Sequence, residues 1–275
     1  MNKEKPHSLS EKLQDSVRFI RSKTGSRPKI AIILGSGLGD FGNTLSMKQV
    51  VDNSFIPHYP QSTIEGHSGR LIFGKMGGKP LLVFQGRVHY YETGKIASVL
   101  YPIYVAHRLG IRTLIVTNAA GGVNREFKPA DLMLMTDQIN LTFENPLGDP
   151  PLVPRHRKNA PLYDDGLQQI IRKTADKKNI VLRRGVYCGI TGPSYETAAE
   201  VKMVRLFGGD AVGMSTVNEV TLAQSLGMRV AGISCITNLS TGISDQKLSH
   251  AEVTEVADRV KQVFAGLLRG VIEKL

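Results

Sequence analysis

The sequence contains no tryptophan, only two cysteines and no apolar run near the ~18 residues of a membrane span. Cys188 and Cys235 form no Cys-x-x-Cys pair, which leaves a zinc cluster or a dithiol redox motif without support. The N-terminus, MNKEKPHSLSEK, lacks the apolar core of a signal peptide. Buried free thiols in a reducing compartment are the simplest account of the two cysteines. We therefore expect a cytoplasmic protein with no membrane partner.

Acidic residues are too few to balance the basic ones, since 24 against 35 give a net charge of +11 at pH 7. Such an excess suits either a nucleic-acid partner or a small acidic substrate. The basic residues form no long block, and this dispersal favours an ordinary solvated surface over a nucleic-acid patch. The sequence signatures of the common RNA-binding modules are also missing. A non-catalytic nucleotide- or RNA-binding protein remains an alternative, but no nucleic-acid partner is expected.

Strand-like apolar runs alternate with helical patterns along the chain, which predicts an α/β fold with a largely buried mixed or parallel sheet. We treat residues 1–275 as one domain, because no linker, repeat or low-complexity tract interrupts the pattern. The predicted strands are 29–34, 80–84, 113–117, 132–135 and 230–236. The predicted helices lie near 8–23, 97–109, 164–178, 198–207, 217–226 and 250–273.

Capping boxes mark the start of three of these helices. The last helix begins with Ser249-x-x-Glu252 and continues with apolar residues at helical spacing, from Val253 through Val263 to Val271. Two further boxes, at 197–200 and 216–219, directly follow a glutamate and a serine. Those two residues, at positions 196 and 215, are therefore placed at helix N-termini, where free N–H groups and the helix dipole favour anions.

A glycine-rich turn, Gly35-Ser-Gly-Leu-Gly39, directly follows the first predicted strand. Glycines let the backbone approach an oxyanion, and the serine hydroxyl adds a donor. The dinucleotide fingerprint fails because Asp40 stands where its third glycine belongs, and no Lys-Ser/Thr follows to make a Walker loop. Phosphate binding and a plain tight turn remain equally open for this segment taken alone.

Arg87 and His89 follow the next predicted strand, and their alternation puts both side chains on one side of an extended segment. A guanidinium and an imidazole placed together make a phosphate clamp. The alternative is an arginine paired to a carboxylate beside a structural histidine. Further polar turns follow at 118–122, 192–197, 213–216 and 237–238. Because ligand sites of α/β proteins gather at strand ends, these turns favour one shared site.

Seven blocks of this sequence resemble the purine nucleoside phosphorylase family, in its trimeric type that favours 6-oxopurines. They are GSGLG at 35–39, EGHSGRL at 65–71, QGRVHYYE at 85–92, TNAAGG at 117–122, GPSYETAAE at 192–200, GMSTVNE at 213–219 and ITN at 236–238. The blocks keep the family's order and spread over most of the chain. The resemblance implies a mixed-sheet α/β fold with a distorted barrel, a homotrimer, and purine-salvage chemistry with phosphate as co-substrate and without metal or organic cofactor.

The resemblance also assigns roles to individual residues. Its phosphate site matches Ser36, His67, Arg87, His89, the main chain at Ala119, and Ser215. Its nucleoside site matches Tyr91, Ala120, Gly121, Tyr195, Glu196, Met214, Asn238 and His250. The residues closest to the chemistry are Asn238, Glu196 and His89.

These roles imply a mechanism for purine nucleosides such as inosine and guanosine. The glycosidic bond breaks through an oxocarbenium-like sugar, and the departing purine carries negative charge. Asn238 donates to N7 and Glu196 accepts from N1–H, while phosphate held by Arg87, His89 and Ser36 attacks the opposite sugar face. The enzyme acts by positioning and charge stabilisation, without a covalent intermediate.

Three departures from the family pattern leave alternatives open. Asn218 stands where the family usually has proline, and Leu239 where mammalian relatives have lysine. The segment at 149–159 looks shorter than in the family, and His156 is its nearest aromatic candidate for reaching a neighbouring subunit. A xanthosine-preferring or a methylthioadenosine phosphorylase is the alternative activity, although the latter typically has an aspartate near position 238.

Overall fold

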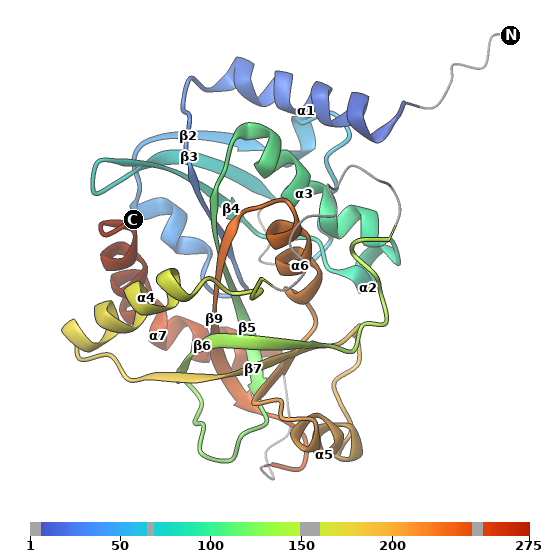
Figure 1. The fold of residues 1–275 in the computed structure, drawn as a ribbon, viewed down its shortest axis with the longest axis vertical. Coiled ribbons are helices and arrows are strands. Elements are labelled where there is room, and N and C mark those ends of the chain that lie inside the picture. Colours follow the sequence, from blue (N-terminus) through green and yellow to red (C-terminus); the bar gives the residue numbers. More distant parts are fainter. Residues whose placement is uncertain (1–6, 65–68, 149–159, 244–249) are drawn as a thin grey trace, which may run out of the picture.

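A mixed β-sheet forms the centre of the fold in this computed structural model, which describes residues 7–64, 69–148, 160–243 and 250–275 (Figure 1). Its side-chain description omits 250–254 and 257–258. Over the described residues the sheet has nine strands in the order β2-β3-β4-β1-β5-β8-β7-β6-β9. The strands are β1 (Ile30–Leu34), β2 (Ser46–Asp52), β3 (Arg70–Met76), β4 (Lys79–Gln85), β5 (Thr113–Gly122), β6 (Leu132–Asn140), β7 (Leu182–Gly189), β8 (Ala211–Gly213) and β9 (Arg229–Leu239).

The second half of the sheet closes on itself, because β9 pairs with β5 as well as with β6. The first half, from β2 to β1, extends from this barrel as an open sheet. Strands β4, β1, β5 and β9 run parallel to one another. Their carboxyl ends therefore meet at one edge, which is where ligand sites form in α/β proteins.

Helices cover both faces of the open sheet and the outside of the barrel (Figure 1). They are α1 (Leu9–Lys23), α2 (Tyr90–Thr93), α3 (Ile96–Leu109), α4 (Asp165–Lys177), α5 (Ala198–Leu206), α6 (Val217–Ser225) and α7 (His250–Ile272), with short 3₁₀ turns η1 (Gly39–Thr44) and η2 (Asn53–Phe55). Strand β1 is buried on both sides, since Ile33 packs with the α1, α3 and α6 cluster and Ile32 with the α4 and α7 cluster. Burial on both faces explains its unbroken apolar sequence.

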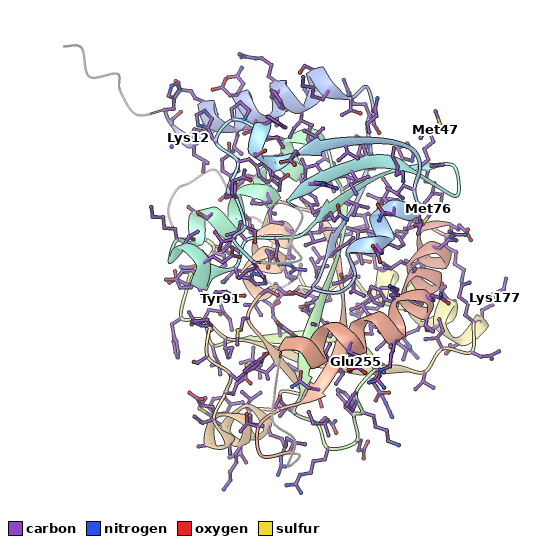
Figure 2. The ribbon with its side chains drawn as sticks, turned by 180° about the vertical axis from the view of Figure 1, so that it is seen from behind. Lys12, Met47, Met76, Tyr91, Lys177 and Glu255 are labelled. Carbon is purple, nitrogen blue, oxygen red and sulfur yellow. The ribbon has the colours of Figure 1, made fainter. Side chains whose placement is uncertain are left out.

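Helix α7 lies across the sheet, as the reverse view shows (Figure 2). Its apolar stripe buries Val256, Val260, Phe264 and Val271, as the helical spacing predicts. Val263 is the exception, since it is 47% exposed and points away from this stripe. The capping residue Ser249 lies outside the described residues, so its predicted box stays a prediction. The boxes at 197–200 and 216–219 are both present.

The predicted α/β class and the predicted helices and strands are confirmed, with ends shifted by a few residues. Strands β2, β3, β7 and β8 were not predicted. Five of the seven residues of β2 are exposed, β7 carries two arginines, and β8 is only three residues long. These three strands lack the apolar pattern on which sequence-based assignment depends. Strand β3 does carry a buried apolar run, Leu71-Ile-Phe73, and was missed all the same. None of the described helices is long and apolar enough to cross a membrane.

Candidate active site

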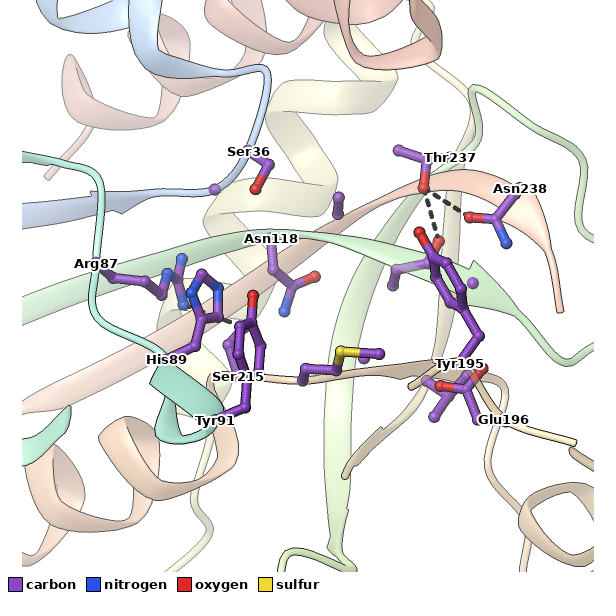
Figure 3. Close-up of a pocket in the computed structure, with 17 residues that line it drawn as sticks. Ser36, Arg87, His89, Tyr91, Asn118, Tyr195, Glu196, Ser215, Thr237 and Asn238 are labelled. Carbon is purple, nitrogen blue, oxygen red and sulfur yellow. Dashed lines mark hydrogen bonds between the residues drawn. The ribbon is translucent and has the colours of Figure 1, made fainter. Parts of the chain in front are cut away.

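A pocket opens at the edge where the parallel strands end (Figure 3). Its residues come from the ends of β1, β5, β8 and β9, from the segment after β4 and from the turns before α5 and α6. The lining residues are Gly35, Ser36, Arg87, His89, Tyr91, Asn118, Ala119, Ala120, Gly121, Tyr195, Glu196, Val212, Gly213, Met214, Ser215, Thr237 and Asn238.

The structure brings together every predicted site residue whose side chain it describes. His67 lies outside the described residues, as does His156 of the predicted inter-subunit segment. His250 is the first residue of α7, but its side chain is outside the description. Each of the other predicted residues lines the pocket. The turns that looked ambiguous one at a time therefore share a single cavity.

The pocket has two chemically different ends (Figure 3). We call the first the anion end, formed by Ser36, Arg87, His89 and Ser215. The second is the base end, where Tyr195, Glu196, Thr237 and Asn238 lie. A cationic donor group at one end and a carboxylate with an amide at the other suit a ligand that is anionic on one side and carries a polar heterocycle on the other.

Arg87 anchors the anion end. It is 7% exposed, and its Nη1 lies 3.2 Å from the Glu219 carboxylate, itself 2% exposed. The same nitrogen donates to Thr216 Oγ1 at 3.1 Å and lies 3.5 Å from Ser215 Oγ, while Nη2 donates to the Thr117 carbonyl. The sequence left two interpretations of Arg87, a residue of a ligand site and a partner of a carboxylate. They are compatible, because the arginine lines the pocket and is also paired to buried Glu219. This pairing fixes the guanidinium before any ligand arrives.

The turn that carries Ser215 has an unusual backbone. Thr216 has φ of 79° and ψ of −50°, and the Val217 N–H donates to the Ser215 carbonyl at 2.9 Å. This is a γ-turn with positive φ, a rare and strained conformation for a β-branched residue. Asn118 Nδ2 donates to Thr216 Oγ1 at 2.9 Å, and the Glu219 carboxylate accepts from the Thr216 N–H. Several buried contacts thus hold the turn in place, as strained backbone at a site requires.

His89 is oriented by Glu92, its neighbour in the first turn of α2. The Glu92 carboxylate accepts from the His89 backbone N–H at 2.6 Å and lies 3.0 Å from Nδ1. Because an ionised carboxylate only accepts, Nδ1 carries the hydrogen. Burial raises the pKa of Glu92, but hydrogen bonds from His89, the Thr63 N–H and Ser62 outweigh it and lower that pKa to about 2. The imidazole also stacks on Tyr91, with ring centroids 5.0 Å apart.

Glu196 at the base end is held in the opposite way. The residue is 8% exposed, and burial raises its pKa. A hydrogen bond from its own backbone N–H acts against this rise, and the Glu200 charge adds to it. Within the described part of the chain, no hydrogen bond or ion pair to the Glu196 carboxylate from another residue is recorded. A buried carboxylate without a partner disfavours its charged form. A ligand N–H placed here would supply the missing donor.

Asn238 presents its amide nitrogen to the pocket. The Thr237 hydroxyl donates to Asn238 Oδ1 at 2.9 Å, which occupies the acceptor side of the amide (Figure 3). Within the described segments, the nitrogen makes one hydrogen bond, a long one of 3.4 Å to the Leu239 carbonyl. Because an amide nitrogen carries two donor hydrogens, at least one remains for a ligand acceptor. Thr237 therefore selects the donor role for Asn238.

Sequence reasoning missed several residues of the site. Asn118 and Thr237 line the pocket beside predicted residues, and both lie within family-like blocks that signalled them. Glu219 and Glu92 do not line it but hold Arg87 and His89. Glu219 was recognised only as a capping residue, and the Glu92 contacts gave no separate sequence signal. Among the described residues, no cluster of three or more His, Cys, Asp or Glu is arranged to hold a metal ion.

Comparison with known proteins places the chain in a family. The model of the phosphorylase superfamily matches residues 29–273. The chain therefore belongs to the phosphorylase superfamily.

Individual relatives are similar over almost the whole chain. Purine nucleoside phosphorylase 1 of Bacillus subtilis is 44% identical over 267 residues, which is 96% of this chain and 98% of the relative. The solved structure of Schistosoma mansoni purine nucleoside phosphorylase in complex with inosine superposes with a TM-score of 0.90 at 34% identity, covering 96% of each chain. The structure of that protein in complex with adenosine gives the same TM-score at 36% identity, again with 96% of each chain covered.

Proposed function

We propose that this chain catalyses the phosphorolysis of purine ribo- and deoxyribonucleosides such as inosine and guanosine in purine salvage. The products are the free base and α-D-ribose 1-phosphate, or 2-deoxy-α-D-ribose 1-phosphate from a deoxyribonucleoside. The observation that carries the proposal is the pocket with an anion end and a base end, built from the strand ends of one sheet. Such a pocket separates the two reacting partners and leaves a sugar between them. Named relatives with this activity are similar over almost the full length.

The anion end holds the attacking phosphate. Arg87 supplies a fixed cationic donor, Ser36 and Ser215 supply hydroxyl donors, and Ala119 supplies a main-chain donor. His89 presents Nε2 to the phosphate, because its Nδ1 hydrogen is given to Glu92. His67, outside the described residues, is proposed as a further phosphate contact. Preorganised donors of this kind stabilise an anion without having to reorient during the reaction. Phosphate is thereby directed at the sugar carbon on the face opposite the base.

The base end binds the purine and stabilises it as it leaves. Glu196 accepts from N1–H of a 6-oxopurine, and Asn238 donates to N7 as negative charge develops on the ring. Tyr195 with Ala120 and Gly121 lines this end, and the amide orientation imposed by Thr237 supports the donor role of Asn238. Hydrogen bonds that strengthen as the charge develops lower the barrier.

The ribose lies between the two ends. Tyr91 and the main chain at Met214 line the middle of the pocket, and His250 at the start of α7 is proposed as a third ribose contact. Phosphate serves as co-substrate, and the proposed steps use no metal or organic cofactor. The proposed steps form no covalent bond between the substrate and the protein.

One assay separates this function from its alternatives. Inosine, guanosine, xanthosine and adenosine are each incubated with the protein, with and without phosphate, and ribose 1-phosphate is measured. We expect phosphate-dependent release from inosine and guanosine. Strongest turnover of xanthosine would support the xanthosine-preferring alternative. Cleavage of methylthioadenosine above inosine would support the methylthioadenosine phosphorylase, and binding without any release would support the non-catalytic alternative.

We also propose a homotrimer. A groove beside the base end carries exposed apolar side chains, among them Phe143 at 91%, Tyr195 at 43% and Met203 at 39%. Apolar side chains gathered at a groove are typical of a protein interface. The number of three subunits comes from the family resemblance and not from the groove. Light scattering should give a mass near three times 30.1 kDa, and a mass of 30.1 kDa would contradict the trimer.

Three further parts of the assignment are proposals. We propose that residues 1–275 act as one domain and that the protein acts in the cytoplasm, where its two buried free cysteines would stay reduced. We also propose that neither nucleic acid nor membrane is a partner.

A further inference from the structure

Tyr187 is a buried tyrosine that the proposed mechanism does not use. It lies on β7, with no exposed surface, and β7 pairs with β8 so that Gly189 stands opposite Gly213. Strand β8 leads directly into the turn that carries Ser215. Tyr187 is therefore placed under the strand end from which the anion end is built.

The hydroxyl of Tyr187 touches the backbone of this strand end. A Cβ atom added to Gly213 would lie 2.5 Å from Tyr187 Oη and 3.3 Å from Cζ. Because real Cβ atoms do not approach an oxygen so closely, glycine is required at 213 for the hydroxyl to sit there. The close approach directs the only polar atom of this side chain at the Gly213–Ser215 turn.

This hydroxyl has no hydrogen-bond partner among the described residues. Ser215 is nevertheless its polar neighbour: burial raises the pKa of Tyr187, and the Ser215 side chain, the Arg87 charge and the Ser215 backbone act against that rise. No hydrogen bond of ordinary length and angle joins the Tyr187 hydroxyl to a described residue. Ser215 Oγ lies 3.0 Å from Thr216 Oγ1 and 3.5 Å from Arg87 Nη1. A buried donor left without an acceptor destabilises the protein.

A bound anion would allow a hydrogen bond between the Tyr187 and Ser215 hydroxyls. Phosphate would accept from the Ser215 hydroxyl and from Arg87, which draws the Ser215 hydrogen toward the pocket. The Ser215 oxygen then turns a lone pair to the rear, where the Tyr187 hydroxyl lies. A donor behind Ser215 would strengthen the hydrogen bond that Ser215 gives to phosphate, because linked hydrogen bonds polarise one another.

We propose that Tyr187 is a positioning residue of the anion end, whose hydroxyl donates to Ser215 when phosphate is bound and so increases phosphate affinity. The inference rests on the proposed function, because it requires phosphate at Ser215. The inference also explains why residue 213 is a glycine, since the Cβ of any other residue would displace the Tyr187 hydroxyl.

The test is Tyr187→Phe, which removes one oxygen and keeps the ring. Without phosphate, the variant should unfold at the same temperature as the wild type or higher, because an unpartnered buried hydroxyl is gone. The upward shift of the unfolding temperature on adding phosphate should be smaller than in the wild type. The KM for phosphate should rise about two- to tenfold, the range expected for one hydrogen bond. The KM for inosine at saturating phosphate should stay within about twofold.

Tyr163→Phe is the matched control. Tyr163 is also fully buried, but its hydroxyl donates to Gln138 Oε1 at 3.0 Å and does not face the pocket. This variant should lower the unfolding temperature without phosphate and leave the phosphate-induced shift unchanged. Ser215→Ala tests the route of the effect: adding Tyr187→Phe to it should not raise the KM for phosphate further, because both changes remove one coupled pair.

The outcomes separate this inference from the proposed function. A Tyr187→Phe protein with the wild-type phosphate KM and phosphate-induced shift would overturn the inference alone. So would an equal loss of phosphate affinity in Tyr163→Phe. A wild-type protein with neither phosphate-dependent inosine cleavage nor a phosphate-induced shift would overturn the proposed function and the inference with it.

Discussion

The two ends of the pocket are stabilised by opposite means. At the anion end, Arg87 and His89 are each paired to a buried carboxylate, and hydrogen bonds surround the Ser215 turn. At the base end, Glu196 is buried and receives no hydrogen bond from another described residue, and Asn238 has an amide nitrogen with one long contact among those residues. The cationic side chains of the anion end are held in place before ligand binds, whereas the polar groups of the base end receive their partners from the ligand.

This difference matches the demands on each end. Phosphate is the same in every turnover, so a rigid set of donors is useful for all substrates. The base must be distinguished from similar bases, and groups left unpaired by the wrong base provide that discrimination. Rigidity thus serves affinity at one end, and unsatisfied polarity serves selectivity at the other.

The largest effect is expected from Arg87→Ala. It removes the phosphate clamp and leaves Glu219 buried without its partner, which typically destabilises a protein by about 3–5 kcal/mol. The KM for phosphate should rise and kcat should fall. Together these changes should correspond to the loss of about 1.5–3 kcal/mol of binding free energy from charge-assisted hydrogen bonds. Urea denaturation and phosphate kinetics measure the two effects separately.

A double variant separates the two roles of this arginine. Arg87→Met combined with Glu219→Gln removes both charges, so most of the stability should return while phosphate affinity stays low. A folded Arg87→Ala protein with unchanged phosphate kinetics would remove the anion end from the proposed mechanism.

The next effect concerns base selection through Asn238. Adenine lacks N1–H, so Glu196 would stay unpaired, at a loss of about 1–3 kcal/mol or more for a charged group. We expect the wild type to have a higher kcat/KM for inosine than for adenosine. Asn238→Asp should narrow this ratio, because a protonated carboxyl donates to N7 while its other oxygen accepts from the 6-amino group.

Phosphate kinetics provide the control for Asn238→Asp, since the anion end is untouched. The Schistosoma mansoni relative has been solved with adenosine, so adenosine binding by itself decides nothing here and turnover is the measurement that counts. Equal kcat/KM for the two nucleosides in the wild type would contradict this account of the base end.

A third prediction uses the opposite pKa shifts at the two ends. The pKa of Glu196 is raised above its ordinary value of 4.5 by burial, so ionisation of this group opposes folding. Its destabilising effect should be absent at pH below 4.5 and should develop as the pH rises through the raised pKa. Glu196→Gln should therefore be more stable than the wild type at neutral pH, and this difference should vanish in acid.

The same variant has a kinetic consequence at the base end. The proposed contact with N1–H requires ionised Glu196, so the KM for inosine should rise as the pH falls below the raised pKa. In Glu196→Gln, turnover should be low and this pH dependence of KM should be lost. A wild-type KM for inosine that stays constant through acid pH would argue against the N1–H contact.

Glu92 should show the reverse pH dependence. Its pKa is lowered from 4.5 to about 2, so its contribution to stability is complete above pH 4.5 and is lost as the pH falls toward 2. Glu92→Gln should be less stable than the wild type at neutral pH and should converge with it in strong acid. The free energies of unfolding of Glu196→Gln and Glu92→Gln, measured across this pH range, test the difference between the two ends of the pocket. If both variants differed from the wild type in the same direction at neutral pH, that difference would be contradicted.

The smallest effect is expected from Asn218→Pro, which restores the residue usual in the family. Asn218 lies in the first turn of α6, where a missing N–H is tolerated, and its side-chain contacts to Asn140 and Thr142 are both 3.4 Å long. The free energy of unfolding should change by at most about 1 kcal/mol. The variant loses two weak contacts, and proline compensates because it lowers the conformational entropy of the unfolded chain. Thermal unfolding measures this change, and Asn218→Ala, which loses the contacts without the entropy gain, is the control.

Sequence reasoning reached most of the fold because its central strands are buried on both faces and its helices carry clear caps. It failed for β2, β3, β7 and β8, and the places of β2 and β8 depend on pairing with other strands of the sheet. It likewise reached the lining residues, since motifs at strand ends carry them, but missed the support given by Glu92, Asn118 and Thr237. These supports depend on side-chain directions and on contacts up to 98 residues apart in the chain.

The sequence by itself determined the α/β class and the strand-end turns, because local periodicity and turn chemistry depend on neighbouring residues. The roles proposed for individual residues toward phosphate and purine came from the resemblance to a family. Only the tertiary structure decided how those groups are held. Pairing of β9 with β5 closes the barrel and brings Asn238 opposite Gly121, and packing of α6 inserts Glu219 beside Arg87. Burial and distance set the pKa of a carboxylate, and neither exists until the chain has folded.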